Sequence, residues 1–264
     1  MAIHDGPGRR SGLLVAWGSA FLAGRAPLAR AAQAAAAADG EAVVAPDMLG
    51  LERLLGRLRA DGVARLELVL PVPGDARGLP GPSVFSAEAL LAGEGVLTGG
   101  GATREGLVPS VETYGPPGDS DTLTTWTMYA VAEPEMLAPP MLTVAEAEAD
   151  LRAALAEATR ELAGSGTARW RPGLDAPLAE LRRTARSGDG PAAELPGDHP
   201  PRACALLAQA ETLAGVLALA AGDPGAGQTG AQVDARGSAL RTLAHAVRRA
   251  RLAAYNAADG ARVS

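Results

Sequence analysis

The sequence predicts an α+β fold, with a small mixed β-sheet and helices in the N-terminal half and a helical, bundle-like C-terminal half. Three observations predict it. Strand-like runs occur before residue 140, apolar residues repeat at helical spacing through most of the chain after it, and the pair Pro139-Pro140 marks the change. We therefore divide the chain into a mixed α/β part, 1–140, and a helical part, 141–264, and expect them to form one integrated domain.

The N-terminal half alternates short helices with short strands. Its helices end at Gly or beside Pro, and its strands are apolar or rich in β-branched and aromatic residues. We expect helices at 13–24, 28–38, 49–60 and 87–91, the last capped by Ser86, and strands at 43–44, 66–70, 94–98, 105–108 and 122–132. Taken as an apolar run, 66–70 predicts a central strand buried on both faces.

The C-terminal half reads as four amphipathic helices. Thr143 and Glu146 form a capping box, and Pro201 suits the first position of a helix. The expected helices lie at about 143–162, 175–186, 201–221 and 236–257. This pattern predicts a bundle, with no strand of four or more residues beyond Thr143.

The composition excludes several classes of function. A net charge of −6 and a pI near 5.2 argue against binding of nucleic acid, which needs a basic face. Cys204 is the single cysteine and the three His are scattered, so we expect no disulfide framework, no metal and no cofactor. Every cation is Arg, but Ile, Asn and Phe are scarce along with Lys, which indicates a GC-rich genome rather than anion recognition.

The N-terminus has the outline of a twin-arginine signal peptide, because Arg9 and Arg10 precede an apolar run. The run is weak, and Gly12 stands where such a signal prefers a large apolar residue. We favour a first helix of a cytoplasmic protein and leave a weak signal peptide as the alternative. No uninterrupted apolar stretch reaches the length of about 18 residues typical of a membrane span, so we expect no membrane partner.

The Pro- and Gly-rich loop at 71–82 is the strongest candidate for a site. It follows a predicted strand, and the carboxyl ends of strands are where open α/β sheets bind ligands. Its two charged residues, Asp75 and Arg77, are the candidate ligand-binding residues: Asp75 as a hydrogen-bond or proton acceptor and Arg77 as an anion clamp. The alternative is a rigid structural turn in which Asp75 caps backbone N–H groups.

Other candidates have a plainer interpretation that we prefer. The triplet Gly99-Gly100-Gly101 fits a hairpin tip better than a phosphate cradle. Cys204 reads as a core residue and His199 as a surface loop residue. Residues 105–150 carry nine acids and no Arg, whereas the last helix carries four Arg at 241–251, and we expect these charges to be solvated or to meet each other.

Four stretches resemble an uncharacterised group of proteins from high-GC actinobacteria. They are the sequence WGSAFLAG at 17–24, LVLPVPGD at 68–75 continuing to Pro82, the helix that follows His199, and AAYN at 253–256. The resemblance covers most of the chain. It implies no activity, cofactor or site residue, and it favours a cytoplasmic protein over an exported precursor.

No cluster of residues identifies an activity, so the sequence leaves the function open. We favour a non-catalytic cytosolic interaction or regulatory protein, whose protein partner the sequence does not define. The alternative is a small-molecule-binding protein or enzyme with its site at the 71–82 loop.

Overall fold

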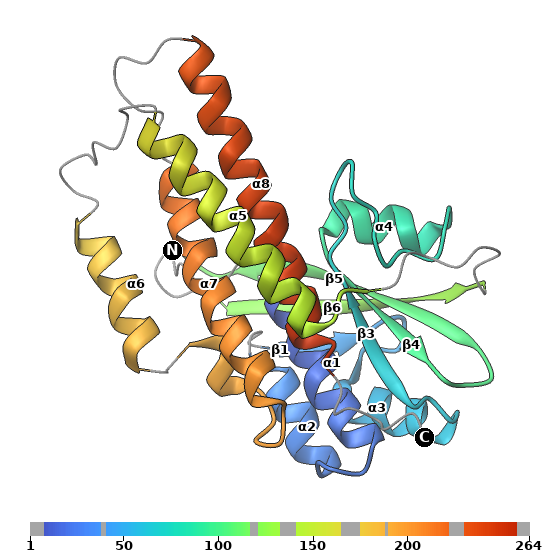
Figure 1. Cartoon of the computed structure of the whole chain (residues 1–264). Coiled ribbons are helices and arrows are strands. Elements are labelled where there is room, and N and C mark those ends of the chain that lie inside the picture. The colour runs from blue at the N-terminus through green and yellow to red at the C-terminus, as the bar shows by residue number, and fades with distance from the viewer. Residues whose placement is uncertain are drawn as a thin grey trace. The chain divides into compact units, whose positions relative to one another are not determined.

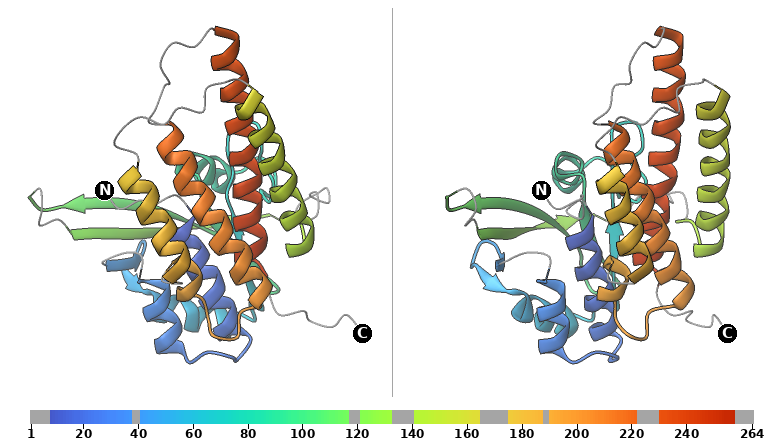
Figure 2. Two further views of the ribbon diagram at one scale, coloured as in Figure 1. Left: turned by 60° about the vertical axis from the view of Figure 1, so that its left-hand side comes forward. Right: turned by 90° about the vertical axis from the view of Figure 1, so that its left-hand side faces the viewer.

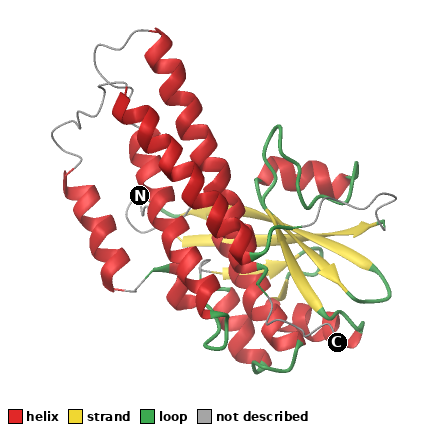
Figure 3. Cartoon of the chain, viewed as in Figure 1, coloured by secondary structure: helices red, strands yellow, loops and turns green. Residues whose placement is uncertain are grey.

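In the computed structural model, strands and helices separate along the chain as predicted (Figures 1 and 3). The structure describes residues 8–37, 41–116, 121–132, 141–164, 175–187, 190–221 and 230–257. Two compact units emerge. The sheet unit comprises Gly6–Met141 and Glu194–His199, and the helical unit comprises Leu142–Ala193 and Pro200–Ala257. The α+β class and the helical C-terminal half are therefore confirmed.

A six-stranded mixed sheet organises the sheet unit, in the order β2-β1-β6-β5-β4-β3. Only the contact between β1 and β6 is parallel. The strands are β1 (Glu41–Val44), β2 (Leu49–Gly50), β3 (Arg65–Val69), β4 (Gly95–Gly99), β5 (Arg104–Tyr114) and β6 (Asp121–Val131). β5 and β6 are much longer than their neighbours, and Figure 2 shows this green hairpin reaching past the other strands.

Helices cover both faces of the sheet because side chains alternate along each strand. The helices of this unit are α1 (Arg9–Leu22), α2 (Leu28–Ala35), α3 (Leu51–Ala60) and α4 (Val84–Ala92). α1 packs on one face so closely that a Cβ at Gly18 would lie 2.5 Å from the side chain of Leu66. α4 packs on the other face, where Phe85 forms a core cluster with Val69 and Val108.

The prediction that 66–70 is a central strand was wrong, because β3 lies at the edge of the sheet. The run is not wholly apolar, since it contains the half-buried Glu67. Leu68 is nevertheless fully buried. The burial of this strand thus comes from helices on the two faces rather than from strands on both sides.

The cap of α4 also differs from the prediction. Ser83, not Ser86, is the N-cap: its hydroxyl accepts a hydrogen bond from the Ser86 amide at 3.1 Å. The helix therefore begins at Val84, three residues earlier than expected. Ser86 lies inside the first turn, where its hydroxyl donates to the Gly81 carbonyl.

The segment Glu194–His199 belongs to the sheet unit although it lies far along the chain. Arg9 donates to both carboxylate oxygens of Glu194, at 2.6 and 3.2 Å. The Trp17 indole N–H donates to the Glu194 carbonyl at 2.7 Å, and Arg25 pairs with Asp198 at 2.5 Å. These bonds fasten the segment to α1 and to the turn that follows it.

Among its described residues, the helical unit has four long helices: α5 (Val144–Gly164), α6 (Asp175–Ser187), α7 (Pro201–Ala221) and α8 (Gly230–Tyr255). A short 3₁₀ helix, Pro191–Glu194, precedes α7. The core is rich in Ala, with Leu151, Leu206 and Leu243 among its larger members. Small side chains let helix backbones approach closely. No strand occurs after Thr143 within the part of the chain that the structure describes, as predicted.

Helix α7 is long and apolar enough to cross a membrane, by length and composition only. Counting uninterrupted apolar residues missed it because Arg202, Gln209 and Glu211 are spread along it. Core helices of globular proteins pass the same test, and in this unit Leu206 and Ala210 of α7 lie in the core cluster with α5 and α8. The absence of a membrane partner stays a prediction.

Candidate functional site

The loop at 71–82 forms an ordered turn at its start. Val72 and Asp75 exchange two backbone hydrogen bonds, of 3.1 and 2.9 Å, across Pro73 and Gly74. Pro fixes φ near −65° and Gly74 has φ of 85°, the combination that a type II turn requires. Further along, Leu79 packs against the core cluster that contains Val131. The loop is thus anchored at both ends to the sheet unit.

Asp75 and Arg77 face each other within this turn. The Asp75 carboxylate accepts the Arg77 amide at 3.3 Å and lies 3.6 Å from the Arg77 guanidinium. Asp75 is mostly buried, whereas Arg77 is half exposed. Contacts with backbone and with each other are what a structural turn requires. Ligand binding by these two residues stays a prediction.

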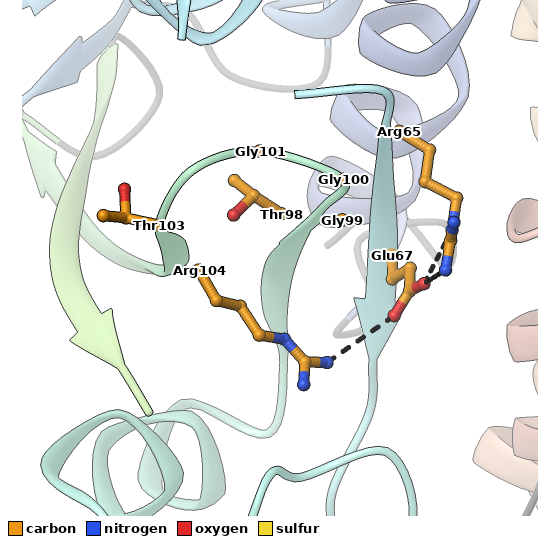
Figure 4. Close-up of a pocket in the computed structure, with 8 residues that line it drawn as sticks. All are labelled: Arg65, Glu67, Thr98, Gly99, Gly100, Gly101, Thr103 and Arg104. Carbon is orange, nitrogen blue, oxygen red and sulfur yellow. Dashed lines mark hydrogen bonds and ion pairs between the residues drawn. The ribbon is translucent and has the colours of Figure 1, made fainter. Parts of the chain in front are cut away.

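A polar cavity of about 230 Å³ lies beside the turn between β4 and β5 (Figure 4). The Gly triplet at 99–101 does form this hairpin tip, as we preferred on sequence grounds. The cavity is lined from three strands and the turn, by Arg65, Glu67, Thr98, Gly99, Gly100, Gly101, Thr103 and Arg104. Sequence reasoning missed the two arginines and the glutamate because they are far apart in the chain.

Close packing fixes the shape of the turn. A Cβ at Gly100 would lie 2.8 Å from the Ala64 Cβ, and Gly100 has φ of 77°, so two independent constraints require glycine there. The Ala64 amide donates to the Gly99 carbonyl at 2.9 Å. Thr98 is buried, and its hydroxyl accepts the Glu105 amide at 2.8 Å. The cavity therefore has a rigid wall.

Charge converges on Glu67 in this cavity. Arg65 contacts one carboxylate oxygen of Glu67, with its Nη2 at 2.6 Å, and the guanidinium of Arg104 lies 3.8 Å from the other oxygen. Figure 4 shows Arg65 and Glu67 on β3 and Arg104 reaching toward them from β5. One carboxylate thus lies between two guanidinium groups from different strands.

A second polar cluster, around Glu94, is buried beneath the start of α1. The Glu94 carboxylate accepts the Ser11 amide at 3.4 Å and lies 3.6 Å from Arg10. Arg10 also donates to the hydroxyl of the buried Thr124. Burial raises the pKa of Glu94, while the bonds from Ser11 and the charge of Arg10 oppose that rise. This carboxylate stabilises the N-terminus of a helix from a distant segment.

The remaining candidates take structural positions. His199 is buried rather than on the surface as expected, and its amide donates to the Pro196 carbonyl at 2.9 Å. Cys204 is half-buried on α7, and burial raises the pKa of its thiol. The acidic stretch and the arginines of α8 meet in part, since Arg249 pairs with Asp150 at 2.7 Å. Within the described ranges, no group of three or more His, Cys, Asp or Glu residues could hold a metal ion.

Fold and cavity together define a two-unit α+β protein with a charged pocket beside a Gly-rich hairpin turn. Residues 11–143 match the model of the Rv1486c-like protein N-terminal domain, and residues 145–252 match that of the Rv1486c-like protein C-terminal domain. The chain belongs to this family.

Mycobacterial relatives confirm the resemblance seen in the sequence. An uncharacterised protein of Mycobacterium tuberculosis H37Rv is 32% identical over 226 residues, covering 78% of this chain and 74% of that protein. An uncharacterised protein of Mycobacterium avium is 28% identical over 238 residues, with the same shares covered. No solved structure matches the chain.

Proposed function

We propose that this is a non-catalytic interaction protein that binds an extended, positively charged segment of a partner protein as an added strand on β5. The observation that carries the proposal is the open edge of β5 at residues 109–114, which we call the β5 edge. Extended peptides bind such edges through backbone hydrogen bonds, and side chains give the specificity.

The β5 edge exists because neighbouring strands differ in length. β6 pairs with β5 along its whole length, from Arg104 opposite Val131 to Tyr114 opposite Asp121. β4 pairs with β5 only at Leu107 and Gly106. Among the residues that the structure describes, no strand adjoins 109–114 on the side away from β6. Residues 110–114 are all exposed, with Val111 at 43% and Tyr114 at 50%.

The other edges of the sheet are less open to a partner. β2 has two residues, and β3 carries the charged side chains of Arg65 and Glu67, a common way of preventing edge-to-edge association. The β5 edge extends for six residues, or about 20 Å at roughly 3.4 Å per residue. That length accommodates a typical strand.

Charge favours a cationic partner. From Glu105 to Asp150 the chain carries nine acidic residues and no Arg or Lys. Arg57 neutralises Glu105, with a contact of 2.9 Å, but Glu112 and Asp121 lie on the exposed distal part of the hairpin. Glu112 and Val111 point to opposite faces of the sheet. A strand that alternates basic and apolar residues therefore matches this edge.

An eight-residue peptide alternating Arg and Val tests the proposal, with binding followed by fluorescence anisotropy. Two versions of the peptide are compared, one N-methylated at its odd-numbered amides and one at its even-numbered amides. One version should lose binding and the other should keep it, because only alternate amides of an added strand face β5. Glu112→Arg should weaken binding several-fold, whereas Glu161→Arg on the exposed side of α5 should not. Equal binding by the two N-methylated peptides would contradict strand addition.

We also propose that the protein works in the cytoplasm. The support is the single Cys204, since exported domains commonly rely on disulfides, and the weak fit of the first apolar run to a signal peptide. Fractionation of the native host, with a reporter fused to the C-terminus, tests this. Recovery of a shortened chain outside the cytoplasm would contradict it.

A further inference from the structure

We propose that the cavity beside the turn between β4 and β5 binds a small phosphate-bearing ligand, held by Arg65 and Arg104 in place of Glu67. The cavity lies at the opposite end of β5 from the edge at 109–114, so this proposal does not depend on strand addition. Four features support it: the placement of the two arginines, the bare glycine between them, the poorly bonded state of Arg104, and the size and lining of the cavity.

Strand pairing places the arginines on one face of the sheet, on either side of a glycine. Arg65 lies directly opposite Gly99, and Arg104 begins the strand on the other side of β4. A Cβ at Gly99 would lie 3.2 Å from the Arg65 Cγ and 3.4 Å from its Cζ. The side chain of Arg65 therefore passes close to the bare backbone of Gly99. Figure 4 shows the Glu67 carboxylate between the guanidinium groups of Arg65 and Arg104.

The guanidinium of Arg104 has N–H donors that make no hydrogen bond to the described residues. Its side chain is only 20% exposed, yet no hydrogen bond from it to any described residue is observed, and its contact with Glu67 is a long one of 3.8 Å. Largely buried guanidinium groups normally use most of their five donors. None of its side-chain nitrogens is sealed from solvent, and Arg104 lines the cavity, so these donors are accessible to a ligand there.

Glu67 shows what kind of group the cavity accepts. Its carboxylate already bridges the two guanidinium groups, tightly to Arg65 and loosely to Arg104. A phosphate carries a charge of about −1.5 to −2 and three strong acceptor oxygens, whereas a carboxylate carries a charge of −1 and two acceptor oxygens. A phosphate can therefore bind both guanidinium groups at once and displace the side chain of Glu67, which is one-third exposed.

The size and lining of the cavity fit a small polar ligand. Its volume of about 230 Å³ is below the range of roughly 300–1,000 Å³ typical of drug-sized ligands. Besides the charged residues, it is lined by Gly99, Gly100, Gly101 and two threonines. Phosphate itself or a short phosphate monoester meets these limits.

Titration calorimetry at constant ionic strength, with inorganic phosphate and then glycerol phosphate, tests the proposal. Wild type should bind both with one site per chain, and acetate more weakly. Arg104→Gln and Arg65→Gln should each weaken binding at least about tenfold, as expected for loss of a charge-assisted pair. Arg152→Gln, on the exposed face of α5, is the matched control and should have no effect.

Glu67→Gln is the sharpest variant because a displaced carboxylate competes with the ligand. Its removal should tighten phosphate binding several-fold. Weaker binding in Glu67→Gln, unchanged binding in Arg104→Gln, or no binding by the folded wild type would each overturn the proposal. Circular dichroism confirms folding of every variant, and Arg65→Gln changes an exposed side chain, so the test stands even if Arg104→Gln unfolds.

Discussion

Gly106 should be the least replaceable glycine of the sheet, and Gly106→Ala tests the packing of α4 on β4 and β5. A Cβ at this position would lie 2.2 Å from the Cδ2 and 2.5 Å from the Cε2 of Phe85. Real contacts between carbon atoms need about 3.5 Å or more. Phe85 is fully buried in the cluster beneath α4, so its ring has little room to move away.

The overlap exceeds 1 Å, which places the cost at the upper end of the range for overpacked cores, about 3 kcal/mol. For a chain of this size that corresponds to a fall of roughly 6–12 °C in melting temperature. Gly56 on α3 is the matched control, because no atom lies within 4 Å of a Cβ there. Gly56→Ala should stabilise the protein by about 0.5–1 kcal/mol through better helix propensity.

Urea unfolding, followed by tryptophan fluorescence, measures both variants. The double variant Gly106→Ala/Phe85→Ala completes a cycle. Phe85→Ala alone should cost about 3–5 kcal/mol, and the added methyl should then cost nothing further, because the ring that it strikes is gone. A cost for Gly106→Ala below about 0.5 kcal/mol, or additive costs in the double variant, would refute this account of the packing.

Three further predictions concern polar groups. Burial raises the pKa of Glu94 above its usual 4.5, so the folded state holds this proton more tightly than the unfolded chain does. The free energy of unfolding should therefore fall as pH rises from about 4.5 through the raised pKa. Glu94→Gln should flatten that part of a stability–pH profile, and an unchanged profile would contradict the prediction. Arg251→Met should lower the free energy of unfolding in urea by roughly 3 kcal/mol, because it leaves the carboxylate of Glu211 charged, unpaired by Arg251 and only 12% exposed. Adding Glu211→Leu should recover most of that free energy. Thr143→Ala should lower the melting temperature seen by circular dichroism, because Thr143 and Glu146 bond each other reciprocally at the start of α5; no shift would show that this cap contributes nothing.

Local patterns predicted the helical half well. The capping box marked the start of α5, and Pro201 marks the first residue of α7. These signals are local, because a cap or a proline acts on the next turn of the same helix. The start of α8 was placed at 236 instead of Gly230 because the first turn lacks the apolar spacing of the rest.

Long-range order was harder to predict. The strand at 105–108 was expected to stop before Pro109, yet β5 continues to Tyr114. Proline lacks an N–H, which matters only where a neighbouring strand would accept it, and Pro109 lies where β4 has already ended. The sequence alone does not say which strand lies next to which. It therefore revealed neither the β5 edge nor the cavity, both of which depend on strand order.

The cavity illustrates the same limit. Arg65, Glu67 and Arg104 are ordinary surface residues in the sequence, separated by up to 39 positions. Only the register of Arg65 opposite Gly99 brings them together. The loop with Asp75 and Arg77 drew attention because its Pro and Gly are contiguous. Its stiffness is visible in a sequence, whereas convergence of charges across strands is not.

The return of Glu194–His199 to the sheet unit has a consequence for how the chain is made. During synthesis from the N-terminus, α1 emerges first, but the partners of Arg9, Trp17 and Arg25 emerge about 170–185 residues later. The sheet unit therefore completes its contacts only after Leu142–Ala193 of the helical unit has left the ribosome, and before α7 and α8 follow. A fragment ending at 141 would lack these bonds, and a protease cut between 164 and 194 would leave two pieces that still hold each other through α1.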